Sequence, residues 1–256
     1  MNVLICGRLK QGKTVLAIAL AHRFSPGVVV WDPRHMVNGI IVEKKSQESL
    51  SENLESAIQD KEYLKGPLVI WPSRNLEEDF EEVCNVLFNP PERFAGNGVD
   101  SGGFAFVVDE ASDLQRSNSI NDSLRVVVKQ HPRTVVIIQC THSLQEWNRS
   151  SKDTMSHLYC FRLQGRSLDY VVEYADVEDE EGLRDSIKSL PEHYYVHVDF
   201  EAAPGTAEWE VCEPLPGDVV AAIQRGVKPP RTHEEIHYGG EEGRQRRKME
   251  SYAGIA

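Results

Sequence analysis

The sequence predicts an α/β fold in which a parallel sheet is flanked by helices, with further β-strands added toward the C-terminus. Over about the first 145 residues, short apolar runs rich in β-branched residues alternate with segments of helical character. These runs are apolar throughout, which is typical of parallel strands covered by helices on both faces. A glycine-rich segment also follows the first apolar run, at the end of a strand where ligands bind in such sheets.

In chain order, a first strand is predicted at 1–6 and a first helix, rich in alanine and leucine, at 13–24. Further core strands are expected where apolar runs end in turn-forming residues, at 27–33, 67–72, 104–112 and 134–143. Further helices are expected at 48–60, 75–88 and 121–130. Beyond this core a short helix is expected within 177–190, and strands that extend the sheet or form an antiparallel edge at 155–165, 193–200 and 207–215.

The chain is expected to form one domain and a tail. Residues 1–227 are long enough for one substantial domain, whereas 228–256 contain few apolar residues and many charges, glycines and prolines, so a flexible tail is predicted there. No apolar run approaches the length of a membrane span, and no signal peptide is expected, because the N-terminus runs straight into the first strand.

Charge and cysteine usage narrow the class of protein. The formal net charge of −12 argues against a protein that coats DNA over its whole surface, so any contact with nucleic acid is expected at a local basic surface. The five cysteines are odd in number and lack metal-ligand spacing. Cys6 and Cys140 lie inside apolar strands, which fits reduced core residues and a reducing compartment.

The segment between the first strand and the first helix, GRLKQGKT, matches the phosphate-binding pattern G-x-x-x-x-G-K-[ST]. Its two glycines let the backbone wrap around a phosphate, and the loop N–H groups and the helix N-terminus point at the anion. The lysine is expected to reach the β- and γ-phosphates and the threonine hydroxyl to ligate Mg²⁺. The predicted nucleotide-binding residues are therefore Gly7, Arg8, Leu9, Lys10, Gln11, Gly12, Lys13 and Thr14.

A pair of acidic residues ends the strand predicted at 104–112. In a parallel sheet this end lies at the edge where ligands bind, so Asp109 and Glu110 are expected beside the phosphate loop. Asp109 is predicted to belong to the Mg²⁺ shell. Glu110 is placed to activate a water molecule as a general base. Water activation favours hydrolysis of a nucleotide over phosphoryl transfer to another acceptor.

Polar residues also end the next predicted strand, where a γ-phosphate sensor or a water-orienting residue is expected. Strand alternation places Gln139 and Thr141 on the same face, so both are candidates. His142 falls on the other side, and a direct role and a solvent-exposed loop position stay equally open for it.

The segments GRLKQGKT, VVVWDP, PLVIWP, FAFVVDEAS and VVIIQCTHS, followed by MSHLYCFRLQG, together resemble the FtsK/HerA superfamily of P-loop ATPases over roughly residues 1–175. The small size looks most like the viral genome-packaging ATPases, and the sequence is also similar to Zot-like phage assembly ATPases. The resemblance implies a P-loop NTPase core of the additional-strand, catalytic-glutamate type with strand order 5-1-4-3-2. It also implies a ring, usually a hexamer, with ATP between neighbours and double-stranded DNA pulled through the pore.

The same resemblance implies roles for individual residues. Lys13 and Thr14 would act on phosphate and Mg²⁺, Asp109 on the metal, Glu110 in catalysis, and Gln139 or Thr141 as sensor. An arginine from the neighbouring subunit would stabilise the transition state. Arg133, just before the last core strand, is the first choice among the candidates Arg125, Arg133, Arg149 and Arg162.

Two further basic positions are candidates for contacts with partners. Arg116, in the loop after the acidic pair, is a candidate for contact with DNA. The basic run 244–248 would contact phosphates, a capsid protein or a portal-vertex protein, or would simply be solvated.

The function predicted from the sequence is an ATP-hydrolysing motor that packages double-stranded viral DNA into a capsid. Its expected location is the host-cell cytoplasm, and association with the virion stays open. A Zot-like assembly or secretion ATPase is the alternative. A small-molecule kinase is a weaker one, because a kinase would need a lid carrying several arginines, while the acidic pair fits water activation better.

Overall fold

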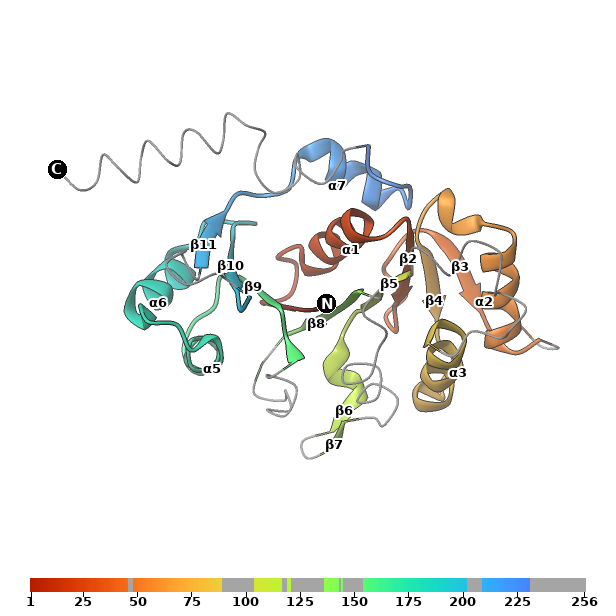
Figure 1. Ribbon diagram of the computed structural model, residues 1–256, viewed down its shortest axis with the longest axis horizontal. Coiled ribbons are helices and arrows are strands. Elements are labelled where there is room, and N and C mark those ends of the chain that lie inside the picture. Colours follow the sequence, from red (N-terminus) through yellow and green to blue (C-terminus); the bar gives the residue numbers. More distant parts are fainter. Residues whose placement is uncertain are drawn as a thin grey trace.

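The computed structural model describes residues 1–45, 48–88, 104–116, 119–120, 136–142, 144, 154–201 and 209–230. Within these residues the fold is mixed α/β, with one large, mostly parallel sheet between two layers of helices (Figure 1). The strand order across the sheet is β11-β10-β9-β1-β8-β5-β2-β4-β3. The predicted fold class is therefore confirmed.

The centre of the sheet consists of five parallel strands in the order β9-β1-β8-β5-β2. If these strands are numbered along the chain, their order is 5-1-4-3-2, as the resemblance implied. Their bounds are β1 (Asn2–Cys6), β2 (Gly27–Trp31), β5 (Phe104–Val108), β8 (Val136–Thr141) and β9 (His157–Phe161). Every residue of β1, β2, β5 and β8 is buried, which explains why these runs are apolar almost throughout.

Both sides of this centre are extended. On one side β4 (Leu68–Trp71) and β3 (Ile40–Glu43) continue the parallel sheet, and β3 was not predicted. On the other side β10 (Tyr195–Asp199) and β11 (Trp209–Cys212) are antiparallel. Both expected arrangements of the late strands therefore occur, because β9 extends the parallel sheet and β10 and β11 form an antiparallel edge. A separate two-stranded sheet consists of β6 (Gln115–Arg116) and β7 (Ser119–Ile120).

The helices divide between the two faces of the large sheet (Figure 1). One face packs against α1 (Lys13–Phe24) and α7 (Gly217–Gln224). The opposite face packs against α2 (Leu50–Gln59), α3 (Leu76–Phe88), α5 (Arg166–Ala175) and α6 (Glu180–Ser189). The described residues also include the short 3-10 turns η1 (Glu62–Leu64) and η4 (Ala111–Leu114). The helices α5 and α7 were not predicted, and the helix predicted at 121–130 lies outside the described residues.

The core on the α2 and α3 face is centred on aromatic side chains. Phe80 of α3 is fully buried and meets Trp31 edge-on, with ring centroids 5.0 Å apart. Phe80 also stacks on Phe106 of β5, with ring centroids 5.8 Å apart. These contacts fix α3 over β2 and β5, the two strands that lead into the polar residues of the candidate site.

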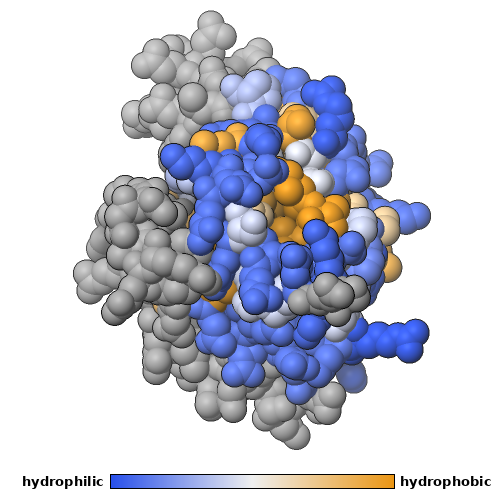
Figure 2. Space-filling model, turned by 90° about the vertical axis from the view of Figure 1, so that its right-hand side faces the viewer, coloured by the Kyte–Doolittle hydropathy of each residue, from blue (hydrophilic) through white to orange (hydrophobic). Residues whose placement is uncertain are grey.

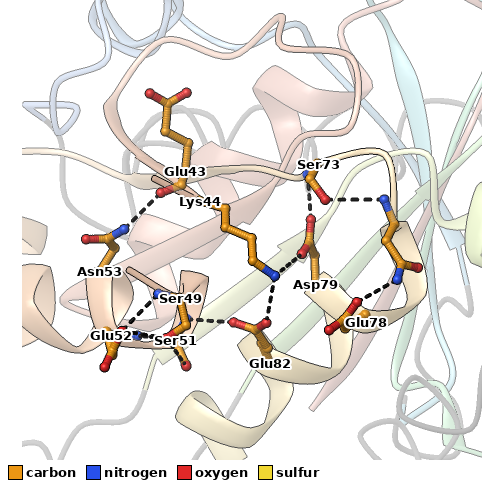
Figure 3. A network of polar contacts seen from close by, with 11 residues as sticks. Glu43, Lys44, Ser49, Ser51, Glu52, Asn53, Ser73, Glu78, Asp79 and Glu82 are labelled. Carbon is orange, nitrogen blue, oxygen red and sulfur yellow. Dashed lines mark hydrogen bonds and ion pairs between the residues drawn. The ribbon is translucent and has the colours of Figure 1, made fainter. Parts of the chain in front are cut away.

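A polar network ties the end of β3 to α2 and α3 (Figure 3). Asp79 is fully buried and accepts a hydrogen bond of 2.5 Å from the backbone N–H of Ser73. The Nζ atom of Lys44 lies 3.8 Å from Asp79 Oδ1 and 3.3 Å from Glu82 Oε1. Glu82 also accepts from the backbone N–H of Ser51 at 3.1 Å. The buried carboxylate is thereby paired, as stability requires.

Figure 2 shows the side of the molecule that carries β3, where apolar residues gather among hydrophilic ones. The exposed side chains of Ile41, Leu64 and Val227 belong to segments on this side, and the backbone of Gly226 lies against that of Gly39. Since β3 is the last strand in the sheet order, its outer edge has no partner strand among the described residues.

Other expectations can be compared with the described residues. All five cysteines lie in them, are buried and form no disulfide bond, so Cys6 and Cys140 are reduced core residues as predicted. No helix in the described part of the chain has the length and apolarity needed to cross a bilayer. Most of the predicted tail, from residue 231 onward, lies outside the described residues, so the division at 227/228 stays a prediction.

Candidate nucleotide-binding and catalytic site

The phosphate loop leaves β1 and enters α1 with both of its glycines in positions that other residues would not tolerate. Gly12, at the N-cap of α1, has a φ of 97° in the left-handed region. A Cβ atom on Gly7 would lie 2.7 Å from Gln11 Oε1 and 2.8 Å from the Cβ atom of Phe161. The loop therefore packs too closely against itself and against β9 to accept a side chain at Gly7.

Gln11 braces the loop. Its Oε1 atom accepts a hydrogen bond of 2.6 Å from the backbone N–H of Arg8, and its Nε2 atom donates to the carbonyl of Arg162 at 3.0 Å. His193, from the turn before β10, brings its Nδ1 atom to 3.2 Å from the carbonyl of Gln11. The loop is thus held in shape by segments that follow β9 and precede β10.

Lys13 is buried at the start of α1, with 6% of its surface exposed. Its Nζ atom donates to the carbonyl of Arg8 at 3.1 Å and lies 3.0 Å from Nδ1 of His142. Burial lowers the pKa of Lys13 below its ordinary value, and the carboxylates of Glu110 and Asp109 oppose that shift. The ammonium group is therefore placed where an anion would relieve its desolvation.

Thr14 and Asp109 meet across the end of the sheet. The Thr14 hydroxyl is placed to donate to either carboxylate oxygen of Asp109, at 3.1 and 3.0 Å. Burial raises the pKa of Asp109 from 3.8 to about 6, although the hydrogen bond from Thr14 opposes the rise. A hydroxyl and a buried carboxylate are hard oxygen donors of the kind that Mg²⁺ prefers. These two residues therefore fit the Mg²⁺ that the sequence implied.

Glu110 follows Asp109 in a sharp turn, with a φ of 50° that non-glycine residues rarely adopt. The turn brings its carboxylate between two cationic or hydrogen-bonding side chains. Oε1 lies 2.6 Å from Nε2 of His142, and Oε2 lies 3.3 Å from Nη2 of Arg34. Arg34 was not predicted as a site residue, and the only signal near it was the Asp32-Pro33 turn.

The polar end of β8 contributes His142 to the site. Besides its contacts with Lys13 and Glu110, its Nδ1 atom lies 3.3 Å from the carbonyl of Gly7. Gln139 and Thr141 are fully buried and lie on the same face of β8 as Ile137, as strand alternation required. The amide atoms of Gln139 have no hydrogen-bond partner among the described residues. The sensor role stays a prediction for Gln139 and Thr141.

The arginines proposed for contacts between subunits fall mostly outside what the structure describes. Arg125, Arg133 and Arg149, with the basic run 244–248, lie in undescribed segments. Arg116 lies in β6, but its side chain is not among the described ones. Arg162 follows β9, is exposed, and holds Gln11 through its backbone carbonyl.

No protein-family model matches the sequence. No curated protein matches it either. Solved structures do match. The genome-packaging NTPase B204 from Sulfolobus turreted icosahedral virus 2, in complex with AMPPCP, is 15% identical and has a TM-score of 0.56, covering 83% of this chain and 97% of its own.

The DNA-packaging ATPase B204 from Sulfolobus turreted icosahedral virus is 16% identical with a TM-score of 0.56, covering 84% of this chain and 98% of its own. The N-terminal domain of zonular occludens toxin from Neisseria meningitidis gives a lower TM-score of 0.45 at 12% identity, covering 86% of this chain and 96% of its own.

At these identities the similarity establishes the fold alone, and it confirms the expected likeness to viral genome-packaging ATPases at that level. The indication of nucleotide binding comes from the residues of the site. A phosphate loop with its lysine, the threonine–aspartate pair and the adjacent glutamate meet at the carboxyl ends of β1 and β5. The chain therefore has the fold of the P-loop NTPases, and that fold brings these residues together at one edge of the sheet.

Proposed function

We propose that this protein is an ATP-hydrolysing motor that translocates double-stranded DNA and packages viral DNA into a capsid. The observation that carries the proposal is the arrangement of Lys13, Thr14, Asp109 and Glu110 at one edge of the sheet, each within hydrogen-bonding distance of another polar group of the site. The similarity of the fold to the packaging NTPase B204 supports the choice of motor.

Each part of the site has a role in hydrolysis. The N–H groups of the phosphate loop and the N-terminus of α1 bind the phosphates, and Lys13 pairs with the β- and γ-oxygens. Thr14 and Asp109 would hold Mg²⁺, which neutralises negative charge on the phosphates. Glu110 orients a water molecule and accepts its proton as the water attacks the γ-phosphate.

A ring is part of the proposal because the resemblance implies that a neighbouring subunit completes the site. In the described residues Nζ of Lys13 donates to the carbonyl of Arg8, and Arg34 is paired with Glu110. An arginine from a neighbouring subunit would add positive charge at the transition state, and Arg133 is the first choice for it. We propose a homo-oligomeric ring, a hexamer by resemblance, acting in the host-cell cytoplasm.

A chain with a net charge of −12 repels DNA phosphates over most of its surface. The DNA contact is therefore proposed at a local basic surface. Arg116 follows the catalytic strand and would sit where nucleotide-dependent movement reaches the pore. The basic run 244–248 is proposed to contact DNA phosphates or a capsid or portal-vertex protein.

DNA-dependent turnover tests this function. We expect double-stranded DNA to raise the rate of phosphate release, and the protein to displace a third strand from a triplex in an ATP-dependent manner. The Arg116→Ala variant is expected to lose the stimulation by DNA while keeping the basal rate. A rate of phosphate release that double-stranded DNA does not raise would refute the motor and favour an assembly or secretion ATPase.

A further inference from the structure

The ring of His142 bridges the two residues on which the proposed hydrolysis depends. On one side its Nδ1 atom lies 3.0 Å from Nζ of Lys13, and on the other its Nε2 atom lies 2.6 Å from Oε1 of Glu110. The same Nδ1 atom also lies 3.3 Å from the carbonyl oxygen of Gly7. One imidazole therefore faces a donor, an acceptor carboxylate and an acceptor carbonyl.

A neutral imidazole carries one proton on one of its nitrogens, so these contacts cannot all be hydrogen bonds at once. Lys13 can only donate. When it donates to Nδ1, that nitrogen must be bare, and the proton is on Nε2, where it is donated to Glu110. The carbonyl of Gly7 can only accept. If Nδ1 donates to Gly7 instead, Nε2 is bare and turns a lone pair toward the carboxylate of Glu110.

The position of Lys13 selects between the two tautomers. A lysine that donates to His142 stabilises the Nε2–H form, which holds Glu110. A lysine that turns toward the β- and γ-phosphates of a nucleotide gives up Nδ1 and so removes the contact that requires this nitrogen to be bare. In the Nδ1–H form, Nδ1 donates to Gly7 and the bare Nε2 releases Glu110.

We propose that His142 is a positioning residue that reports phosphate binding at Lys13 to the catalytic carboxylate of Glu110 by exchanging its tautomer. The inference rests on the proposed function, because it assumes that Lys13 binds the phosphates of ATP. This tautomer exchange keeps Glu110 hydrogen-bonded to His142 until a nucleotide with β- and γ-phosphates is bound. Water activation by Glu110 is thereby limited when no such nucleotide is present.

The other oxygen of Glu110 explains why one hydrogen bond can control its position. Arg34 pairs with Oε2 at 3.3 Å, so the release of Oε1 leaves the carboxylate held at one end and able to turn. The loop that carries Arg34 is fixed by Asp32, whose carboxylate accepts from the backbone N–H groups of Arg34 and Val37 at 3.2 and 2.7 Å. The backbone of Arg34 is therefore held beside the site, from which its side chain reaches Glu110.

The exchange conserves protons. Nε2 gives a proton to water and Nδ1 takes one from water, so the ring is neutral before and after. With 27% of its side chain exposed, His142 is accessible enough for this exchange with solvent.

Solid-state NMR on sedimented protein containing ¹³C,¹⁵N-labelled histidine measures the tautomer directly. Its His142 signals are identified by their loss in the His142→Gln variant. At about pH 8, where an ordinary imidazole is neutral, we expect the Nε2–H form without nucleotide. We expect the Nδ1–H form with Mg²⁺ and AMPPCP, and no change with AMP, which lacks the phosphates that would draw Lys13 away.

Three results would overturn this relay, in which His142 exchanges its tautomer when Lys13 binds phosphate. They are an Nδ1–H form or an imidazolium without nucleotide, an unchanged His142 signal with AMPPCP bound, and the same change of tautomer with AMP. Calorimetry on the same samples separates this from a failure of the proposed function. If AMPPCP does not bind at all, the nucleotide assignment itself is wrong, and the relay falls with it.

Two variants of His142 each keep one of its two side-chain contacts, and their kcat values test the proposal. Gln can still donate to Glu110 but has no second ring nitrogen for Lys13, so it keeps the carboxylate engaged, and kcat is expected to fall roughly tenfold or more. Asn can accept from Lys13 but is too short to reach Glu110, so its kcat is expected to stay above that of the Gln variant. If Gln retains wild-type kcat or exceeds Asn, the relay is refuted.

Discussion

Acidification is expected to destabilise the protein through one residue of the first helix, His22. This imidazole lies on α1, and neither of its ring nitrogens has a hydrogen-bond partner among the described residues. Burial, followed by the charge of Lys228, lowers the pKa of His22 from 6.5 to about 4. Protonation is therefore easier in the unfolded chain than in the folded one.

The size of the effect follows from that difference in pKa. Between about pH 6.5 and pH 4 the unfolded state binds the proton and the folded state does not, so stability falls as the pH falls. Above this range both states are neutral at His22, and the residue adds no pH dependence. Because each tenfold difference in proton affinity corresponds to 1.36 kcal/mol, the full loss is on the order of 3 kcal/mol near pH 4.

Denaturant unfolding of the wild type and of His22→Leu at about pH 7.5 and pH 4 measures this loss. The variant is expected to lose less stability on acidification, by roughly 3 kcal/mol, because the contributions of other titrating groups cancel in the comparison. An equal loss in His22→Leu and wild type would refute the assignment.

Two substitutions test the packing around the site. Gly7→Ala would force a Cβ atom to within 2.7 Å of Gln11 Oε1 and 2.8 Å of Phe161. Calorimetry should therefore show a roughly tenfold or greater loss of nucleotide affinity, and unchanged affinity would contradict the described loop. Phe80→Ala should lower the free energy of unfolding by about 3–5 kcal/mol, because Phe80 is fully buried against Trp31. A loss below about 1 kcal/mol would show that this face of the sheet is not packed as described.

The predictable parts of the fold are those whose local sequence pattern fits only one type of structure. The central strands are buried on both faces, so their continuous apolar runs predict a parallel sheet. The phosphate-loop pattern and the Asp109–Glu110 pair predict where ligands meet that sheet, because both follow strands whose carboxyl ends share one edge.

Other elements could not be found as easily. β3 is only four residues long and largely exposed, so Ile40–Glu43 shows no continuous buried run. The helix α5 had a usable signal, since Leu168, Val171, Val172 and Ala175 are buried at helical spacing, but its charged surroundings obscured it.

Within the site, the contacts that depend on tertiary structure were the ones missed. Alternation along β8 applies only as far as Thr141, where the strand ends, so it gives no direction for the side chain of His142. The approach of Arg34 to Glu110 depends on the turn organised by Asp32, two residues earlier. Such contacts join segments far apart in sequence, and no local pattern encodes them.

The claim that this site hydrolyses ATP with Glu110 as the base is tested most directly by phosphate release from Glu110→Gln at saturating Mg²⁺ and ATP. Glu180→Gln, an exposed substitution on α6, is the matched control. Loss of the general base is expected to lower kcat by about 10²- to 10⁴-fold, with ATP affinity kept and the control unchanged. Turnover near the wild-type rate in Glu110→Gln would contradict the assignment.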